Sequence, residues 1–445
     1  MSKIRLFGTS SGYVEIAPAA AASNNTLTAP STVGEIIAKD AAGAIGVTSV
    51  HTTNVVATGT AKVGAAVTIS ESGIEASGIG ITCASINGTQ IGGRRNLVIN
   101  GAMLIAQRAT SSTSDGYQTV DRFRPDSGNE DETPTQTQVD VSSGTSPYAE
   151  GFRRALRITN GNQTSGAGAD DYVQIEHRFE AQNIANSGWN YTSSSSFITL
   201  SFWVKSSVSK DFQMTLRTTD GTSQSFQFET PTLSANTWTK VVKTIPGNSN
   251  LQFDNDVSQG MTIYWFPYIG TAYTSSSNTL NSWVQSTSST YGVTDPTTWY
   301  TTNDATFELT GVQLEVGSQA TAFEHRSKGE ELELCKRYFQ VLVDDGNAKS
   351  FGNATGYNSD TIHLVTPLRP EMRTTPTLEY TTGTDYYGAY QNNTVDYFND
   401  WTVVGNSHPR AVDISAGGGV SITAGTSVLL RTTQSASKIR FTAEI

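Results

Sequence analysis

Large aromatic side chains are almost missing from the first fifth of the chain. The 445 residues contain 17 Phe, 7 Trp and 17 Tyr, but only Phe7 and Tyr13 lie before Arg94. A monomeric globular domain of that size needs large side chains to bury enough apolar area. This part consists mainly of Ala, Gly, Ser, Thr, Val and Ile instead. We therefore expect a slender segment, either disordered or ordered only by association with other copies of itself, followed by a bulky, aromatic-rich head.

Charged residues are also scarce. They make up 16% of the chain, against roughly 25% in typical soluble domains, and Ser, Thr, Asn, Gln and Gly take their place. This composition is typical of extended β-structure and unusual for a cytosolic metabolic enzyme. The formal net charge of -11 argues against nucleic acid as a partner, because binding phosphate needs a positive surface.

Cysteine and long apolar runs are lacking as well. Cys83 and Cys335 are too few for a disulfide scaffold, and no Cys/His spacing indicates zinc. The opening residues show no apolar run of a signal peptide. No stretch approaches the ~18 apolar residues needed to cross a membrane. We therefore expect no membrane insertion, and assembly in a cytoplasm.

Isoleucines recur with a short period within the aromatic-poor segment. Their intervals are mostly five residues, with glycines between them: Ile69, Ile74, Ile79, Ile81, Ile86 and Ile91. This period is too short for a self-sufficient layer, but three chains wound together could bury one small aliphatic side chain per rung. We predict a trimeric shaft over residues 31–95, preceded by an attachment segment over residues 1–30. A flexible Gly/Ser linker is the alternative.

The aromatic-rich part predicts β-structure with one helix. Phe197–Lys205 alternates so that Ile198, Leu200, Phe202 and Val204 share one apolar face. Many such strands predict a jelly-roll-like β-sandwich over residues 96–326. A linking helix is predicted over residues 327–340, and a small distal β tip domain over residues 341–445. The predicted fold class is therefore mainly β, with a thin trimeric N-terminal shaft.

Three segments resemble tail-fibre and related structural proteins of marine tailed bacteriophages. They are residues 3–26, the run Asn96-Leu-Val-Ile-Asn-Gly-Ala-Met-Leu-Ile-Ala-Gln-Arg108, and the run Phe307-Glu-Leu-Thr-Gly-Val-Gln-Leu-Glu-Val-Gly-Ser318 followed by Phe323-Glu-His-Arg326. The resemblance covers roughly residues 1–340. It implies a homotrimer that docks on phage tail or adaptor proteins through its N-terminus and contacts a receptor at its distal end. The strand pair at 197–205 and 236–245 is similar to carbohydrate-binding-module sandwiches.

Candidate ligand residues follow from how proteins bind sugars. Aromatic rings stack on the apolar faces of pyranoses, while carboxylates and amides bond to the hydroxyls. Trp203, Trp238 and Trp265 lie inside strand patterns and are expected to pack. In the sandwich loops we select Trp283, Tyr291 and Trp299. In the tip, tyrosines interleaved with Asn and Asp form an adaptable surface, with packing between trimer subunits as the alternative: Tyr386, Tyr387, Tyr390, Asn392, Asp396, Tyr397 and Trp401.

Motifs for metals and catalysis are not found. The five histidines have no paired spacing, and no acidic cluster matches an EF-hand, although a structural calcium ion in loop carboxylates stays possible. No nucleophile elbow, Walker loop or zinc-hydrolase motif is present. We therefore predict no enzyme and no cofactor.

These observations together predict a homotrimeric phage tail fibre, part of the virion, that attaches it to the host by binding a receptor, a surface glycan. Two alternatives stay open. One is a polysaccharide-cleaving tail spike, since glycoside hydrolysis needs only two suitably spaced carboxylates. The other is a structural virion appendage without receptor binding.

Overall fold

The computed structural model describes residues 95–344 and 346–445, and before them only the backbone of seven short strands. Among these, β1 (Ile4–Phe7) pairs antiparallel with β2 (Tyr13–Ile16). The others form small antiparallel sheets: β3 (Ala61–Val63), β4 (Val67–Ser70) and β5 (Gly73–Ala76), and β6 (Ser85–Ile86) with β7 (Thr89–Gln90). The rest of the predicted attachment segment and shaft lies outside the described residues.

The chain divides into two compact units, Met1–Thr82 and Cys83–Ile445. The second unit is mainly β, as the sequence predicted. Its first sheet has the order β16-β13-β19-β11-β10-β8. The strands are β8 (Ser111–Ser112), β10 (Thr135–Asp140), β11 (Arg154–Thr159), β13 (Phe197–Ser206), β16 (Thr239–Pro246) and β19 (Thr306–Val316).

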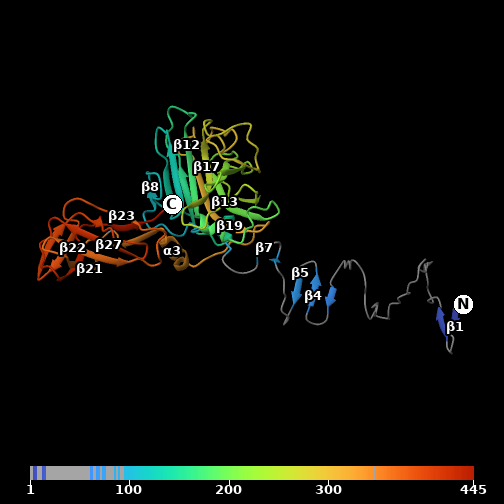
Figure 1. Cartoon of the computed structure of the whole chain (residues 1–445). Coiled ribbons are helices and arrows are strands. Elements are labelled where there is room, and N and C mark those ends of the chain that lie inside the picture. The colour runs from blue at the N-terminus through green and yellow to red at the C-terminus, as the bar shows by residue number, and fades with distance from the viewer. Residues whose placement is uncertain are drawn as a thin grey trace. The chain divides into compact units, whose positions relative to one another are not determined.

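A second six-stranded antiparallel sheet has the order β18-β15-β14-β17-β12-β9. We call it the site sheet. Its strands are β9 (Arg124–Gly128), β12 (Tyr172–Glu180), β14 (Gln213–Thr218), β15 (Gln224–Glu229), β17 (Gln259–Ile269) and β18 (Trp283–Gln285). Figure 1 shows β12 and β17 of the site sheet beside β13 and β19 of the first sheet.

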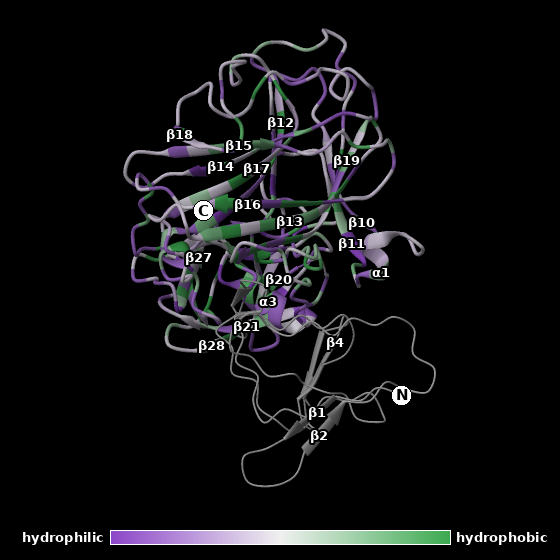
Figure 2. Cartoon of the chain, turned by 90° about the vertical axis from the view of Figure 1, so that its right-hand side faces the viewer, coloured by the Kyte–Doolittle hydropathy of each residue, from purple (hydrophilic) through white to green (hydrophobic). Residues whose placement is uncertain are grey.

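The sandwich core lies between the two sheets. The predicted apolar face of β13 is confirmed, since Ile198, Leu200, Phe202 and Val204 are all buried there. The site sheet contributes Trp265 and its alternating neighbours, and apolar residues follow β13, β16 and β17 in Figure 2. Burying each large side chain contributes roughly 1.5–3 kcal/mol, so this core accounts for the folding of the head.

The outer face of the first sheet is covered in part. Trp203 on β13 packs there with Phe152, Ala155 and Val141, and Tyr148 of helix α1 (Ser146–Ala149) and Phe323 pack against this cluster. The Trp203 indole N–H donates to Glu150 at 3.0 Å. A short helix α2 (Ala181–Ala185) follows β12.

The linking helix is shorter than predicted. Helix α3 spans Lys328–Lys336 and begins with a capping box between Ser327 and Glu330. The prediction of a helix to residue 340 is wrong, because Phe339 already pairs with Thr442 in strand β20 (Phe339–Val343). Cys335 and Tyr338 are buried against Ile99 and Ile105, so tertiary packing and strand pairing override the helical pattern beyond Lys336.

The residues after α3 form two sheets around a second core. One is three-stranded, with the order β20-β29-β23, and adds β23 (Thr377–Tyr380) and β29 (Ile439–Thr442). The other has the order β25-β24-β28-β21-β22-β27-β26. Its strands are β21 (Ser350–Gly356), β22 (Thr361–Pro367), β24 (Tyr387–Gln391), β25 (Thr394–Phe398), β26 (Thr402–Val403), β27 (Ala411–Gly417) and β28 (Ser427–Thr432).

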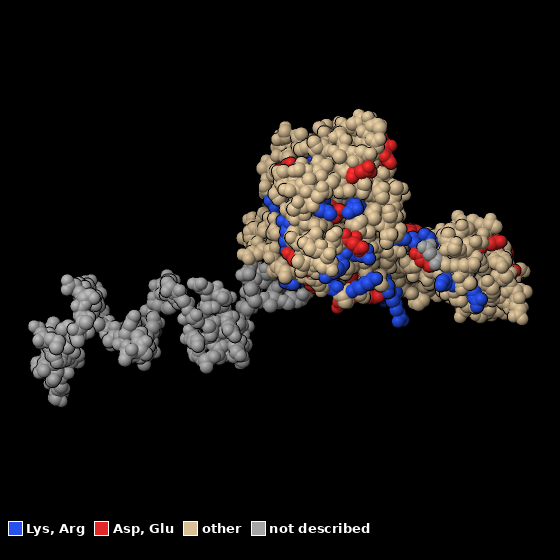
Figure 3. Space-filling model, turned by 180° about the vertical axis from the view of Figure 1, so that it is seen from behind, with Lys and Arg blue, Asp and Glu red and all other residues tan. Residues whose placement is uncertain are grey.

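Charges are sparse on the described surface, and Figure 3 shows them as small groups among largely uncharged residues. Among the described residues, none of the helices has the length and apolar character needed to cross a bilayer.

Candidate functional site

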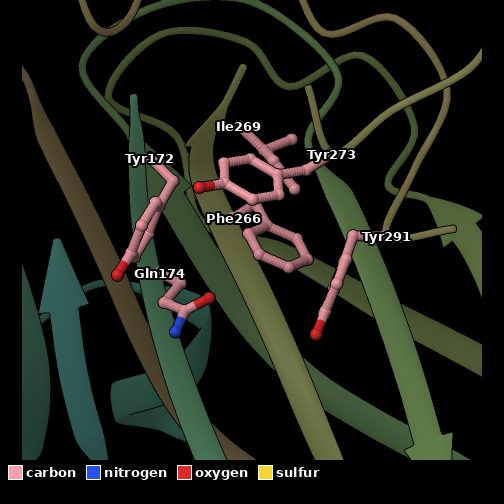
Figure 4. Close-up of a pocket in the computed structure, with 6 residues that line it drawn as sticks. All are labelled: Tyr172, Gln174, Phe266, Ile269, Tyr273 and Tyr291. Carbon is pink, nitrogen blue, oxygen red and sulfur yellow. The ribbon is translucent and has the colours of Figure 1, made fainter. Parts of the chain in front are cut away.

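The outer face of the site sheet carries an aromatic cavity of about 210 Å³. Tyr172 and Gln174 reach it from β12, and Phe266 and Ile269 from β17. Its remaining walls come from two loops, through Tyr273 and Tyr291. Figure 4 shows Phe266 and Ile269 between Tyr172 on one side and Tyr291 on the other. We call this cavity with its six lining residues the aromatic pocket.

Strand alternation explains why these side chains face outward. On β12, Tyr172 and Gln174 are half-buried, while Val173 and Ile175 between and after them enter the sandwich core. On β17, Phe266 belongs to a separate outer cluster, while Trp265 beside it is in the core. The period of two along a strand thus places one aromatic set inside and a second set outside.

The aromatic rings of this outer face pack against one another in one stacked pair and several edge-to-face pairs. The rings of Tyr264 and Phe266 stack with 5.7 Å between centroids. Tyr291 stands nearly perpendicular to both, with centroids 5.5 Å from Tyr264 and 6.0 Å from Phe266. Tyr172 and Tyr273 form a second perpendicular pair at 5.7 Å. The rings therefore hold one another in place. Tyr264 and Phe266 are buried, while Tyr172, Tyr273 and Tyr291 are half-buried.

A polar network lies beside the pocket on β9 and β12. The Gln174 amide donates to Glu176 at 2.6 Å. Glu176 also pairs with Arg178 at 2.6 Å and with Arg124 at 3.1 Å. Burial, with the nearby Asp126 carboxylate, raises the pKa of Tyr172 to about 12. The Tyr172 hydroxyl therefore stays protonated and can act as donor or acceptor towards a ligand hydroxyl.

Several hydrogen bonds fix the loop that carries Tyr291. Thr215 on β14 donates to the Tyr291 carbonyl. The Gln227 amide donates to the Thr290 carbonyl at 2.8 Å, and the Val293 N–H donates to Gln213 at 3.2 Å. These anchors come from the outward positions of β14 and β15, so the sheet itself orients Tyr291.

A second hollow, of about 380 Å³, lies at the β15–β18 edge of the site sheet. Trp283 lines it together with uncharged polar side chains: Thr222, Gln224, Asn250, Gln252 and Gln285, with Val284 beside them. The indole N–H of Trp283 donates to the Pro246 carbonyl at 2.7 Å, and its ring lies 5.3 Å from that of Phe226. The Trp283 side chain thus packs against Phe226 on one side and lines the hollow on the other.

Three of the residues predicted to bind a ligand are core residues. Trp299 is 0% exposed and donates to the Thr306 carbonyl. Tyr387 is 0% exposed, with its hydroxyl bonded to the Lys438 carbonyl at 2.7 Å. Trp401 is 3% exposed and packs against Phe398. The predictions for these three are wrong, because their loops and strands turn the rings into the domain cores.

The other predicted tip residues surround the β24–β25 hairpin. Tyr390 and Tyr397 lie on its outer face, since Tyr387 and Phe398 occupy the inner one. Tyr397 is 45% exposed, and Asn392 forms the turn with φ of 51°. Asp396 accepts from the Ser421 N–H, and Tyr386 is half-buried next to the hairpin. The structure therefore places these five predicted residues on or directly beside one hairpin.

The sequence reasoning missed Tyr172, Gln174, Phe266 and Tyr273. Tyr172 and Gln174 lie on β12 and Phe266 on β17, while Tyr273 follows β17 in a loop. The sequence signal that could have identified Tyr172 and Gln174 is the alternation along β12. Core residues there alternate with polar and aromatic residues at every second position, namely Tyr172, Gln174, Glu176 and Arg178.

No group of three metal-binding side chains is found among the described residues. At least one acidic loop is engaged in hydrogen bonds within the chain. Asp131, for example, accepts from the Ser165 N–H at 2.6 Å and from its hydroxyl at 2.9 Å.

No family model matches the chain, and no curated protein matches it significantly. Solved structures give low-scoring similarities. The enzymatically active domain of tailspike protein 4 from bacteriophage CBA120 has a TM-score of 0.27 at 9% identity, over 50% of this chain and 21% of that one. A putative sugar-binding protein from Bacteroides thetaiotaomicron has 0.28 at 11% identity, over 50% and 99%. The N-terminal cellulose-binding domain of Cellulomonas fimi β-1,4-glucanase C has 0.23 at 10%, over 49% and 99%. The structural neighbours therefore include a phage tailspike domain and carbohydrate-binding modules.

Proposed function

We propose that the sandwich binds a saccharide in the aromatic pocket. The observation that carries this proposal is the cavity in which the half-buried rings of Tyr273 and Tyr291 lie near the amide of Gln174 and the hydroxyl of Tyr172. A pyranose offers an apolar face for the rings and hydroxyls for the polar groups, so one cavity can satisfy both. The carboxylates nearest to it, Asp126 and Glu176, are already engaged by Arg124, an arrangement that suits recognition better than hydrolysis.

In the virion this site would serve attachment. The segments at residues 3–26, 96–108 and 307–318 support a homotrimeric tail fibre that docks through its N-terminus and presents the head to a host surface glycan. Three weak sites on one particle bind a cell surface with an avidity that one site lacks. We place the receptor site in the aromatic pocket and not in the tip, because two of the predicted tip residues, Tyr387 and Trp401, are buried in the core of the tip.

Removing the pocket aromatics tests the binding site. Tyr273→Ala and Tyr291→Ala are each expected to weaken binding about tenfold or more, since a well-buried aromatic contact contributes roughly 1.5–3 kcal/mol. Binding is measured on an array of bacterial surface polysaccharides. Tyr397→Ala in the tip is the control and should bind like the unaltered protein. If only Tyr397→Ala lost glycan binding, the receptor site would lie in the tip. If the unaltered protein bound no glycan on the array, the proposal would be contradicted.

The oligomeric state tests the fibre. Light scattering of the full chain is expected to give about three times its 47.6 kDa mass. The physical reason is that the aromatic-poor segment has too few large side chains to form a core alone. A particle with the mass of one chain would contradict the trimer while leaving glycan binding by the sandwich intact.

A further inference from the structure

Arg217 lies next to the aromatic pocket on the outer face of β14. Its Nη1 donates to the hydroxyl of Tyr291, and its Cζ lies 4.7 Å from the centroid of that ring. Tyr291 in turn lines the cavity. The guanidinium is therefore only one side chain away from the space in which we place the sugar, and it is half-buried.

The other arginines of this face have carboxylate partners. Arg124 pairs with Asp126 and Glu176, each at 3.1 Å. Arg178 pairs with Glu176 at 2.6 Å. Arg217, in contrast, has no carboxylate within ion-pair distance among residues 95–344 and 346–445. Within that part of the chain, the only hydrogen bond of its guanidinium goes to the neutral hydroxyl of Tyr291.

Paired and unpaired arginines therefore lie on different strands of the outer face of the site sheet. The paired charges lie on β9 and β12, and the unpaired cation lies on β14, with β17 between them. A guanidinium partly withdrawn from water without an anion is costly. Its planar fork of donors fits a carboxylate, sulfate or phosphate group in two parallel hydrogen bonds.

We propose that the saccharide bound in the aromatic pocket is acidic, and that Arg217 binds its anionic substituent. This inference rests on the proposed glycan binding and adds the class of ligand. The sugar ring packs against Tyr273 and Tyr291, which line the cavity and are half-buried. Its hydroxyls face Gln174 and Tyr172, and its anionic group faces β14. Arg217 is then a specificity-determining residue, because a neutral sugar leaves its charge without a partner.

The test is an array in which each acidic polysaccharide stands beside its neutral counterpart, made by carboxyl reduction, desulfation or dephosphorylation. The full-length protein is expected to bind the acidic members about tenfold more tightly, the size of one charge-assisted contact. This preference should shrink between about 50 and about 300 mM NaCl, as screening increases. Arg217→Met should abolish it and Arg217→Lys should retain part of it. Arg154→Met is the matched control, because Arg154 pairs with the exposed Asp140 on the first sheet.

Equal binding of acidic and neutral members, or an acidic preference that survives in Arg217→Met, overturns the inference but leaves glycan binding standing. No binding to any member contradicts the proposed function itself. The Arg217→Met variant could fail to fold. In that case Arg217→Lys and the salt dependence of the unaltered protein decide whether Arg217 sets the preference for acidic saccharides.

Discussion

Glu444→Gln is expected to lower the free energy of unfolding by about 3–5 kcal/mol, because it leaves a buried cation without its counter-charge. Glu444 pairs with Arg122, whose side chain is 1% exposed, and lies 3.3 Å from Arg108. The Arg122 guanidinium also donates to the Arg178 carbonyl at 2.8 Å and lies 3.5 Å from the centre of the Tyr338 ring. Denaturant titration followed by tryptophan fluorescence measures the loss.

The surface pair Arg410–Glu371 provides the control for this experiment. Its side chains are 74% and 47% exposed, so Glu371→Gln should change stability by no more than about 0.5 kcal/mol. In the double variant Arg122→Met/Glu444→Gln both charges are gone, and part of the lost stability should return. A double variant as unstable as the sum of the two single variants would show that the two side chains do not act as a pair.

Lys210→Met is expected to cost about 3–5 kcal/mol at pH 7 and to weaken glycan binding at the same time. Lys210 bonds to the Asp295 carboxylate at 2.6 Å and to the Pro296 carbonyl at 3.0 Å, and both charged side chains are almost fully buried. The other carboxylate oxygen of Asp295 accepts from the N–H of Ile269, which lines the pocket. The variant therefore releases the end of the loop that carries Tyr291.

The pH dependence separates this mechanism from simple misfolding. Burial raises the pKa of Asp295 to about 6, although Lys210 opposes the rise. A carboxyl group whose pKa is higher in the folded state contributes stability that is full below about pH 4, the unfolded value, and is lost as the pH rises through the folded value. Without Lys210 the folded pKa rises further, so Lys210→Met should regain stability when the pH falls from 7 to 5. Adding Asp295→Asn should remove this recovery, and a recovery that persists would assign it to another group.

The alternation of residues within single strands could be predicted from the sequence, and so could the mainly β character of the head and its longest described helix, α3; the short helices α1 and α2 were not predicted. Ile198, Leu200, Phe202 and Val204 are buried as their period of two indicates. The helix begins where Ser327 and Glu330 form a capping box. Its end was misjudged because the pairing of Phe339 with Thr442 is a contact between residues far apart in the chain.

The candidate site was predicted only in part, for a related reason. Tyr291 and Trp283 were selected because aromatic residues in polar loops often meet ligands, and both line hollows. The same reasoning selected Trp299, which is buried. A loop aromatic can point towards a ligand or into the nearest core, and local sequence does not distinguish these two directions.

The sequence by itself determined the mainly β class, the aromatic-poor beginning and the scarcity of charge, since these follow from composition and from local periodicity. Only the tertiary structure decided which aromatic residues share an outward face. The aromatic pocket joins Tyr172 on β12 to Phe266 on β17 and to Tyr291 on a loop held by β14. Such a surface arises from the register between strands that are distant in sequence, and that register is fixed by packing across the whole sandwich.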